Sequence, residues 1–194
     1  MTAVDLPTAP DLPLRTDRLV LRAFRPQDAD ALLVLHGDPA AVRYVPYGPR
    51  DRAQVVQVLE RKTASTALRE EGDLLELAVE RADDGTLVGD VLLVLRSVPH
   101  ETLEVGYLFA TAQHGRGYAT EAVRTVVDLA FTRLGARRVT ARVDDRNAPS
   151  RALLERLGFR LEAHLVENEW FKGELTSETD YGLLAREWPV HAVG

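Results

Sequence analysis

The chain has 194 residues, of which 45% are hydrophobic and 28% are charged, and its formal net charge is −6. This length suits one domain with a single well-filled core and is short for two. The absence of cysteine excludes disulfides, thiolate metal sites and a cysteine nucleophile. The negative charge argues against general nucleic-acid binding. No basic segment followed by an apolar run opens the sequence and no stretch approaches 18 apolar residues, so we expect a cytoplasmic protein that neither binds nor spans a membrane.

The first residues are rich in proline, and we expect a flexible arm over residues 1–14 followed by a single domain over residues 15–190. The domain begins with a strand pattern over residues 18–24. Pro26, at a first-turn position, then opens a helix that continues to His36.

A second helix is expected after Asp51, because Gln54 stands three residues later and completes a capping box. Residues 74–80 and 86–95 are apolar strand patterns. The Asp84-Gly85 pair between them is a strong hairpin-turn signal, so we expect these two strands to pair with each other.

The clearest helix covers residues 119–134, with apolar side chains at i, i+3 and i+4 spacing. Strand patterns precede it at residues 103–109 and follow it at residues 138–144. A short helix over residues 147–157 and two antiparallel strands around Gly173 complete the order. A mixed sheet with helices on both faces accommodates this order in one domain.

The stretch Gly115-Arg116-Gly117 stands directly before the clearest helix. Glycines at a helix start let backbone N–H groups approach a ligand closely, and the helix dipole favours a negative group there. The residues that follow, Tyr118 and Ala119, fit neither the Walker loop nor the dinucleotide fingerprint. The stretch therefore indicates a phosphate cradle of another kind, with a plain tight turn as the alternative.

This order of elements, with a Gly-x-Gly turn between strand and helix, resembles the GNAT family of acyl-CoA-dependent N-acetyltransferases over about residues 15–188. The family motif Gln/Arg-x-x-Gly-x-Gly/Ala aligns with residues 114–119, where histidine replaces the common glutamine or arginine. The resemblance implies an α/β (α+β) fold whose central sheet is mixed, mostly antiparallel and twisted. It implies about seven strands, with helices on both faces.

The resemblance also implies acetyl-CoA as the acyl donor. No metal is expected, because the chain has no cysteine and no histidine–carboxylate ligand spacing. In the family, the backbone of the strand before the turn binds the pantetheine arm and the turn wraps the pyrophosphate. The residues implied to bind the donor are Leu108, Phe109, Ala110, His114, Gly115, Arg116, Gly117, Tyr118, Ala119, Thr120, Asn147 and Ser150. A side-chain role for His114 is doubtful, and Arg116 is either solvated or paired with a phosphate.

Three further stretches, at residues 104–107, 147–159 and 180–188, look like the RimJ/RimL subgroup, whose prototypes acetylate the N-terminal amine of ribosomal proteins. Many members of the family carry a tyrosine as general acid where this chain has Leu154. The subgroup resemblance instead implies Ser150 as the acid and Glu169 as the base.

Each of these polar residues has a purely structural alternative. Ser150 could be an ordinary first-turn serine, and Asn147 caps its helix whatever the function. Glu169 and Glu104, the reserve candidate for the base, could both be exposed strand residues. The histidines at positions 36, 100 and 164 show no ligand spacing and receive no role.

The acceptor is predicted as an amine, and its pKa bears on which amine. At pH 7.5 roughly a quarter of an α-amine is neutral, against about 0.1% of a lysine amine, so an α-amine is the easier acceptor. A protein N-terminus is therefore the first hypothesis. A small amine or aminoglycoside-like antibiotic is the second, for which Glu167, Glu169, Glu174 and Glu178 could form an acidic cluster. A non-catalytic acyl-CoA-binding regulatory protein is the third. The assembly is left open, and a homodimer is one option.

Overall fold

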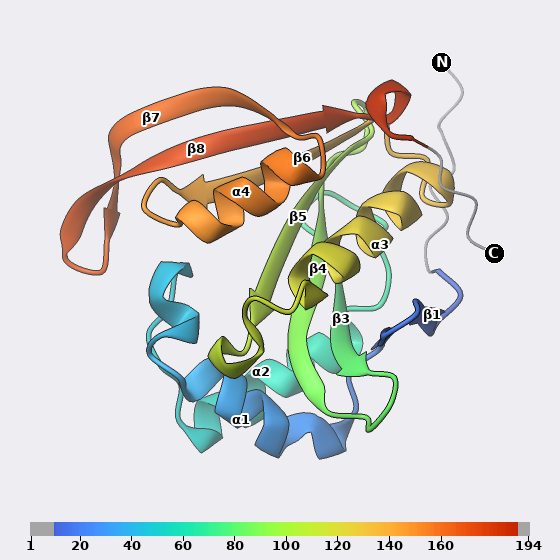
Figure 1. The fold of residues 1–194 in the computed structure, drawn as a ribbon, viewed down its shortest axis with the longest axis vertical. Coiled ribbons are helices and arrows are strands. Elements are labelled where there is room, and N and C mark those ends of the chain that lie inside the picture. Colours follow the sequence, from blue (N-terminus) through green and yellow to red (C-terminus); the bar gives the residue numbers. More distant parts are fainter. Residues whose placement is uncertain (1–9, 190–194) are drawn as a thin grey trace.

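The computed structural model describes residues 10–189, so most of the arm expected over residues 1–14 lies outside the described residues. One sheet of eight strands, in the order β1-β2-β3-β4-β5-β6-β8-β7, forms the centre of the molecule (Figure 1). The strands are β1 (Leu14–Arg15), β2 (Leu19–Arg22), β3 (Leu74–Arg81), β4 (Leu87–Ser97), β5 (Thr102–Phe109), β6 (Arg138–Asp144), β7 (Arg160–Phe171) and β8 (Glu174–Leu184).

The mixed, mostly antiparallel sheet is confirmed, with β5 and β6 as its one parallel pair within residues 10–189. We expected about seven strands, and the eighth is β1, in which Leu14 pairs with Leu21. Leu14 is 9% exposed and belongs to the core, so the domain begins slightly before the expected boundary.

In the described part of the chain, four α-helices cover the sheet, namely α1 (Ala29–Gly37), α2 (Arg52–Ala64), α3 (Tyr118–Thr132) and α4 (Ala148–Arg156). The predicted capping box of α2 is present: the Asp51 carboxylate accepts the Gln54 N–H at 2.9 Å, and the Gln54 side chain accepts the Asp51 N–H at 2.9 Å. These reciprocal bonds satisfy two amides that the helix itself cannot, which is why it begins there.

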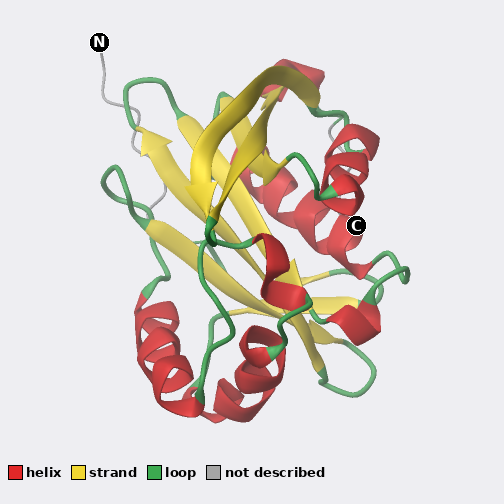
Figure 2. Cartoon of the chain, turned by 90° about the vertical axis from the view of Figure 1, so that its left-hand side faces the viewer, coloured by secondary structure: helices red, strands yellow, loops and turns green. Residues whose placement is uncertain are grey.

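The helices lie on both faces of the sheet, as expected (Figure 2). Alternation along the strands sends Leu77 and Val79 to one core, with α3 and α4, and Ala78 to the other, with α1 and α2. Each face of the sheet therefore has its own apolar core, covered by its own pair of helices.

The parallel pairing of β5 with β6 is short. It joins only three residue pairs and ends at Glu104 opposite Thr140, after which the two strands diverge (Figure 1). The last five residues of β5 therefore lack a strand neighbour on that side, and a gap opens in the middle of the sheet.

The β7–β8 hairpin continues the sheet beyond β6, because β8 pairs with β6 (Figure 1). Its own ladder is interrupted between Leu161 and Ala163 and between Leu165 and Glu169. At its tip, Lys172 donates to the carbonyl oxygens of Val42, at 2.6 Å, and Arg43, at 3.1 Å. Both carbonyls belong to the 3₁₀ segment Ala41–Tyr44 that follows α1. The hairpin tip is thereby tied to the α1–α2 connection.

A buried charged cluster fixes α1 and α2 to the sheet. Lys62 of α2 lies 2.6 Å from the Glu76 carboxylate of β3 and 3.0 Å from the Asp90 carboxylate of β4. Nε2 of His36, from α1, lies 3.1 Å from the same Asp90 oxygen. All four side chains are at most 10% exposed. His36, for which the sequence suggested no role, thus joins a helix to the sheet.

Burial acts against the charges of this cluster, but their pairing outweighs it. Burial raises the pKa of Asp90, yet the Lys62 charge and the His36 hydrogen bond lower that pKa to about 2. Burial likewise lowers the pKa of Lys62, but the charges of Asp90 and Glu76 raise it by more, so the pKa of Lys62 lies above its ordinary value. The Lys62–Asp90 pair is therefore fully ionised at neutral pH.

Because the Asp90 pKa lies below the value of about 3.9 typical of an unfolded chain, its contribution to stability is complete above pH about 4 and is lost as the pH falls through about 2. At pH 7 we expect Asp90→Asn to lower the free energy of unfolding by about 3 kcal/mol, because Lys62 loses one of two carboxylates. Between pH 4 and 2 the wild type should lose on the order of 2 kcal/mol more than the variant.

Urea denaturation from pH 2 to 7 measures both effects. Asp30→Asn is the matched control, since the Asp30 side chain is 81% exposed and pairs with Arg52 at the surface. Equal pH dependence in wild type and Asp90→Asn would show that Asp90 is not the titrating group.

Candidate active site

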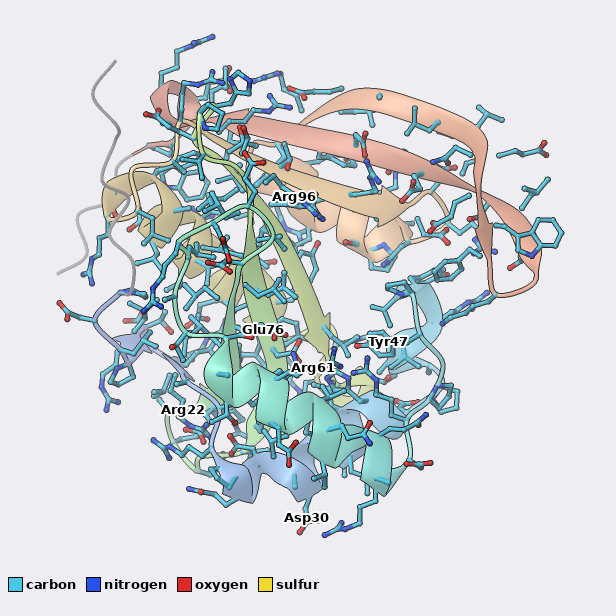
Figure 3. The ribbon with its side chains drawn as sticks, turned by 180° about the vertical axis from the view of Figure 1, so that it is seen from behind. Arg22, Asp30, Tyr47, Arg61, Glu76 and Arg96 are labelled. Carbon is cyan, nitrogen blue, oxygen red and sulfur yellow. The ribbon has the colours of Figure 1, made fainter. Side chains whose placement is uncertain are left out.

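A cavity of about 840 Å³ lies at the gap between β5 and β6. Its walls include residues 105–108 of β5 and residues 141–144 of β6. Ser150 of α4 lines it on one side of the sheet, and Tyr47 and Arg61 line it on the other. In Figure 3 the labelled side chains of Arg61, Glu76 and Arg96 follow one another from α2 towards the hairpin. The cavity is thus lined from both helix layers.

Backbone donors of β5 face this gap. The Ala110 N–H donates to the Val88 carbonyl of β4 at 2.9 Å, so the alternating N–H groups of Phe109, Tyr107 and Val105 point to the opposite side, where the ladder with β6 has ended. Of the three residues predicted to bind the pantetheine arm, Phe109 has its N–H towards the gap. Leu108 lines the cavity, and the Ala110 N–H is already bonded to β4.

The turn after β5 has the geometry of an anion cradle. Gly115 and Gly117 adopt left-handed φ angles of 75° and 81°. Gly117 is the N-cap of α3 and has no side chain to cap it, and the first intrahelical bond runs from the Glu121 N–H to the Gly117 carbonyl at 3.1 Å. The N–H groups of Tyr118, Ala119 and Thr120 therefore have no intrahelical partner and can bind an anion.

Basic side chains from distant elements surround this turn. Arg18, before β2, pairs with Glu121 at 2.5 Å and donates to the Arg116 carbonyl at 3.0 Å. Arg156 of α4 donates to the Thr120 hydroxyl at 3.3 Å. Neither arginine was predicted, and no local spacing could reveal them, since Arg18 lies 98 positions before Arg116.

The His114 side chain, for which a role was doubtful, forms a hydrogen bond to the backbone. Its Nε2 lies 3.1 Å from the Phe109 carbonyl oxygen, so the ring donates to the backbone at the end of β5. This bond ties the glycine turn to the strand that borders the gap. A glutamine at position 114 could donate the same kind of bond.

Ser150 lies beside a tyrosine that the sequence did not single out as catalytic. Its Oγ is 2.6 Å from the Tyr107 hydroxyl, and both residues line the cavity. Burial raises the pKa of Tyr107 to about 12, although the Ser150 hydrogen bond lowers it in part. The Asn147 side chain accepts the Ser150 N–H at 3.3 Å, so it caps α4 as expected. Leu154, in the position of the usual tyrosine acid, is fully buried.

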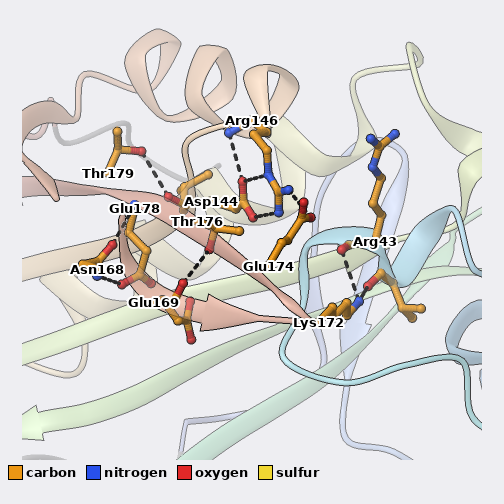
Figure 4. A network of polar contacts seen from close by, with 12 residues as sticks. Arg43, Asp144, Arg146, Asn168, Glu169, Lys172, Glu174, Thr176, Glu178 and Thr179 are labelled. Atoms are coloured by element: carbon orange, nitrogen blue, oxygen red, sulfur yellow. Dashed lines mark hydrogen bonds and ion pairs between the residues drawn. The ribbon is translucent and has the colours of Figure 1, made fainter. Parts of the chain in front are cut away.

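Glu104 and Glu169 occupy different places. Glu104 lines the cavity, and Arg96 binds both of its carboxylate oxygens, at 3.0 and 2.8 Å. Glu169 lies on β7 opposite Thr176 and does not line the cavity. Its carboxylate has no hydrogen-bond partner within residues 10–189 (Figure 4).

The other glutamates considered as an acidic cluster are also outside the cavity lining. Glu174 pairs with Arg146 at 2.5 Å, and Glu178 accepts from the Asn168 side chain at 2.6 Å (Figure 4). Two of the four carboxylates are thus already engaged by the protein itself.

Between residues 10 and 189, no three His, Cys, Asp or Glu side chains are grouped so that they could hold a metal ion. Among the helices of this same range, none combines the length and apolar character needed to cross a membrane.

Comparison with known proteins gives consistent matches. The chain is 29% identical over 175 residues to the uncharacterized N-acetyltransferase p20 of Bacillus licheniformis, which covers 90% of this chain and 97% of that protein. It is 25% identical to the putative ribosomal N-acetyltransferase YdaF of Bacillus subtilis (strain 168), over 89% of this chain and 94% of that protein.

Solved structures share the fold. An acetyltransferase of the GNAT family from Bacillus anthracis superimposes with a TM-score of 0.82 at 22% identity, over 91% of this chain and 100% of that chain. A spermidine N-acetyltransferase from Vibrio cholerae, in complex with CoA and spermine, gives 0.75 at 23% identity, over 89% and 98%.

The family model of the acetyltransferase (GNAT) domain matches residues 18–160. Since this match spans both strands of the gap and the glycine turn between them, the chain belongs to the GNAT family of N-acetyltransferases.

Proposed function

We propose that this chain transfers the acetyl group of acetyl-CoA to a primary amine, and that the reaction takes place in the gap between β5 and β6. The observation that carries the proposal is the early end of the β5–β6 ladder at Glu104 and Thr140, followed by the left-handed glycine turn. Unpaired strand donors and an uncapped helix start lie in sequence along one path. They suit a ligand that has amide groups at one end and phosphates at the other.

The donor would lie along this path with its pyrophosphate on the N–H groups of residues 117–120. Arg116 and Arg156 supply positive charge around the turn, while Arg18, whose charge is paired with Glu121, donates to the Arg116 carbonyl and braces the turn. Asn147 and Ser150, at the start of α4, would face the thioester end of the donor, because both line the cavity. The N–H groups at Tyr107 and Phe109 can polarise the acetyl carbonyl, a type of contact whose removal typically costs about 3 kcal/mol.

In the transfer, the neutral amine attacks the acetyl carbon, a C–N bond forms, the C–S bond breaks, and the leaving sulfur must be stabilised as a thiolate. The Ser150 and Tyr107 hydroxyls are the pair available for this step. A tyrosine with a pKa of about 12 stays protonated, but giving its proton to an ordinary thiolate, whose acid has a pKa of about 8.5, is uphill by about 5 kcal/mol. The pair therefore stabilises the thiolate by hydrogen bonding, and solvent supplies the final proton.

Two glutamates remain candidates for the base that removes the amine proton. The subgroup resemblance supports Glu169, whereas the cavity lining supports Glu104, since Glu104 lies within it and Glu169 does not. On this geometry we place the base at Glu104, acting through water. The choice is open to a direct test.

For the acceptor, we propose the α-amine of a protein N-terminus or of a small molecule with a similarly low amine pKa. The similarity to a putative ribosomal N-acetyltransferase supports the N-terminal acceptor and the RimJ/RimL-like assignment. A polycationic antibiotic is less suited, because none of the four glutamates considered for it lines the cavity. A non-catalytic binding protein would bind coenzyme A without acetylating any amine.

Gly117→Val tests the donor site. A valine places side-chain atoms in the cradle and must adopt a φ of 81°, and its Cβ would lie 3.4 Å from the Arg18 guanidinium. We expect coenzyme A affinity, measured by calorimetry, to fall at least tenfold, or about 1.4 kcal/mol. Gly85→Val is the control, since Gly85 has a similar φ of 71° in the β3–β4 turn. Unchanged affinity in a folded Gly117→Val protein would remove the proposed donor site.

Ser150→Ala and Tyr107→Phe test the hydroxyl pair. Each should lower kcat about tenfold with little change in the KM for acetyl-CoA, because backbone N–H groups still stabilise the carbonyl oxygen. The double variant should lose less than the product of the two single losses, since the hydroxyls act together. Tyr181→Phe is the matched control, because the Tyr181 hydroxyl donates to Glu155 outside the cavity lining. Wild-type kcat in Tyr107→Phe would exclude the tyrosine from the reaction.

Glu104→Gln and Glu169→Gln locate the base. General base catalysis typically contributes 10²- to 10⁴-fold, so we expect Glu104→Gln to lower kcat by about 10²-fold at pH 7. Raising the pH should recover much of this loss, because the amine then loses its proton without the base. Glu169→Gln should have a much smaller effect. The reverse result, with Glu169→Gln inactive and Glu104→Gln active, would assign the base to β7.

A further inference from the structure

The side of the cavity formed by α2 and the α1–α2 connection carries two arginines without a carboxylate partner. Five Lys and Arg side chains line the cavity. Three of them are paired: Lys62 with Glu76 and Asp90, Arg96 with Glu104, and Arg142 with Asp180. The other two, Arg50 and Arg61, form no ion pair with any residue in the range 10–189.

Among the described residues, no carboxylate of the lining forms an ion pair with Arg50 or Arg61. Asp144 is paired with Arg146 at 2.6 Å. Asp73 accepts the backbone N–H groups of Arg69, at 2.7 Å, and Glu70, at 2.9 Å, and these bonds lower its pKa. The remaining carboxylates of the lining are those paired with Lys62 and Arg96. The lining as a whole therefore carries as many acidic as basic side chains, five of each. Arg50 and Arg61 differ from its other basic groups in having no direct carboxylate partner within residues 10–189.

Arg50 is held in place by a tyrosine and a histidine, with no carboxylate in direct contact among the described residues. Its guanidinium lies 3.6 Å from the centroid of the Tyr47 ring, and its Nη1 lies 3.0 Å from Nδ1 of His36. The Tyr47 hydroxyl is 3.1 Å from the same nitrogen, and the two rings are stacked at 5.5 Å. Because the Arg50 guanidinium can only donate, Nδ1 of His36 is the acceptor, and the Nε2 N–H donates a hydrogen bond to Asp90.

This arrangement orients a guanidinium without neutralising it. The chain of contacts from Asp90 through His36 and Tyr47 fixes Arg50, while most of its five N–H donors remain available. Because Arg50 is already ordered in the folded protein, it loses little side-chain entropy on binding, and this strengthens its binding of a planar anion. A carboxylate matches the guanidinium fork and can form two parallel hydrogen bonds with it.

We propose that the acceptor carries a carboxylate as well as its amine, and that Arg50 binds this carboxylate with support from Arg61. The inference rests on the proposed function of the cavity and adds the chemical class of its acceptor, an amino acid or a short peptide with an acidic group near its amine. A polycation is disfavoured at this wall, because its charges would lie beside two unpaired arginines.

The test compares acceptors that differ only in the carboxylate, by thiol release from acetyl-CoA. One pair is the tripeptide amide Ser-Glu-Ala against Ser-Gln-Ala, and the other is free serine against serinamide. The first pair detects an acidic side chain and the second an α-carboxylate, so the responding pair identifies the source. Removing a carboxylate also changes the amine's own pKa. We therefore define the preference as the ratio of kcat/KM for the acidic acceptor to kcat/KM for its neutral partner. Comparing this ratio between wild type and variant cancels the intrinsic reactivity of the two amines.

In at least one pair we expect the preference for the acidic member to fall at least tenfold in Arg50→Gln and further in the double variant with Arg61→Gln. Arg50→Lys should restore only part of it, since a lysine keeps the charge but not the fork. Arg52→Gln is the matched control, because Arg52 also lies on α2 but pairs with Asp30 at the surface, outside the lining. Its preference should equal that of the wild type.

The outcomes separate the two proposals. Acetylation of the neutral acceptors, with preferences unchanged by the Arg50 and Arg61 variants, would overturn the carboxylate site and leave the proposed function intact. If no acceptor releases thiol, calorimetry of the same peptides on the coenzyme A complex gives the answer. Tighter binding of the acidic member that is lost in Arg50→Gln supports the site, and equal binding overturns it. Failure to bind coenzyme A would overturn both proposals.

Discussion

The short parallel ladder between β5 and β6 is the constraint on which the rest of this structure depends. Three residue pairs hold the two strands together, and beyond Glu104 they diverge. A full ladder would use the N–H groups at Tyr107 and Phe109 and would close the cavity. Because α3 follows β5 and α4 follows β6, the divergence also sets the space between the glycine turn and Ser150. The unpaired N–H groups of β5 and the position of the Tyr107–Ser150 hydroxyl pair are thus two results of one short ladder.

In a sheet divided in this way, the two halves are also joined by contacts other than the β5–β6 hydrogen bonds, and several of these contacts involve charged side chains. The cluster around Lys62 and Asp90 anchors α1 and α2 to β3 and β4 on one side of the gap. Lys172 ties the hairpin from the other side to the segment after α1. The same cluster continues through His36 to Tyr47 and Arg50. The stability of the α1–α2 layer and the orientation of Arg50 in the cavity are therefore physically linked.

Local patterns were sufficient to predict most of the fold. The Asp51–Gln54 capping box and the glycine turn could be predicted because each is formed by residues only a few positions apart. The eighth strand was missed because two residues show no period. Contacts between distant residues could not be predicted: Tyr107 meets Ser150 across 43 positions and His36 meets Asp90 across 54. Similarly, only the folded chain shows that Glu104 lines the cavity and Glu169 does not.

The two outer edges of the sheet differ from the inner one at β5. β1 is only two residues long, and β7 is interrupted twice and carries charged side chains such as Arg160 and Glu162. Short, bulged and charged edges discourage a second chain from adding a strand, which is how natural sheets avoid edge-to-edge aggregation. In contrast, the unpaired part of β5 lies inside a walled cavity. The unpaired backbone groups of β5 thus lie among side chains from both helix layers, whereas the outer edges of the sheet are protected by their short length, bulges and charges.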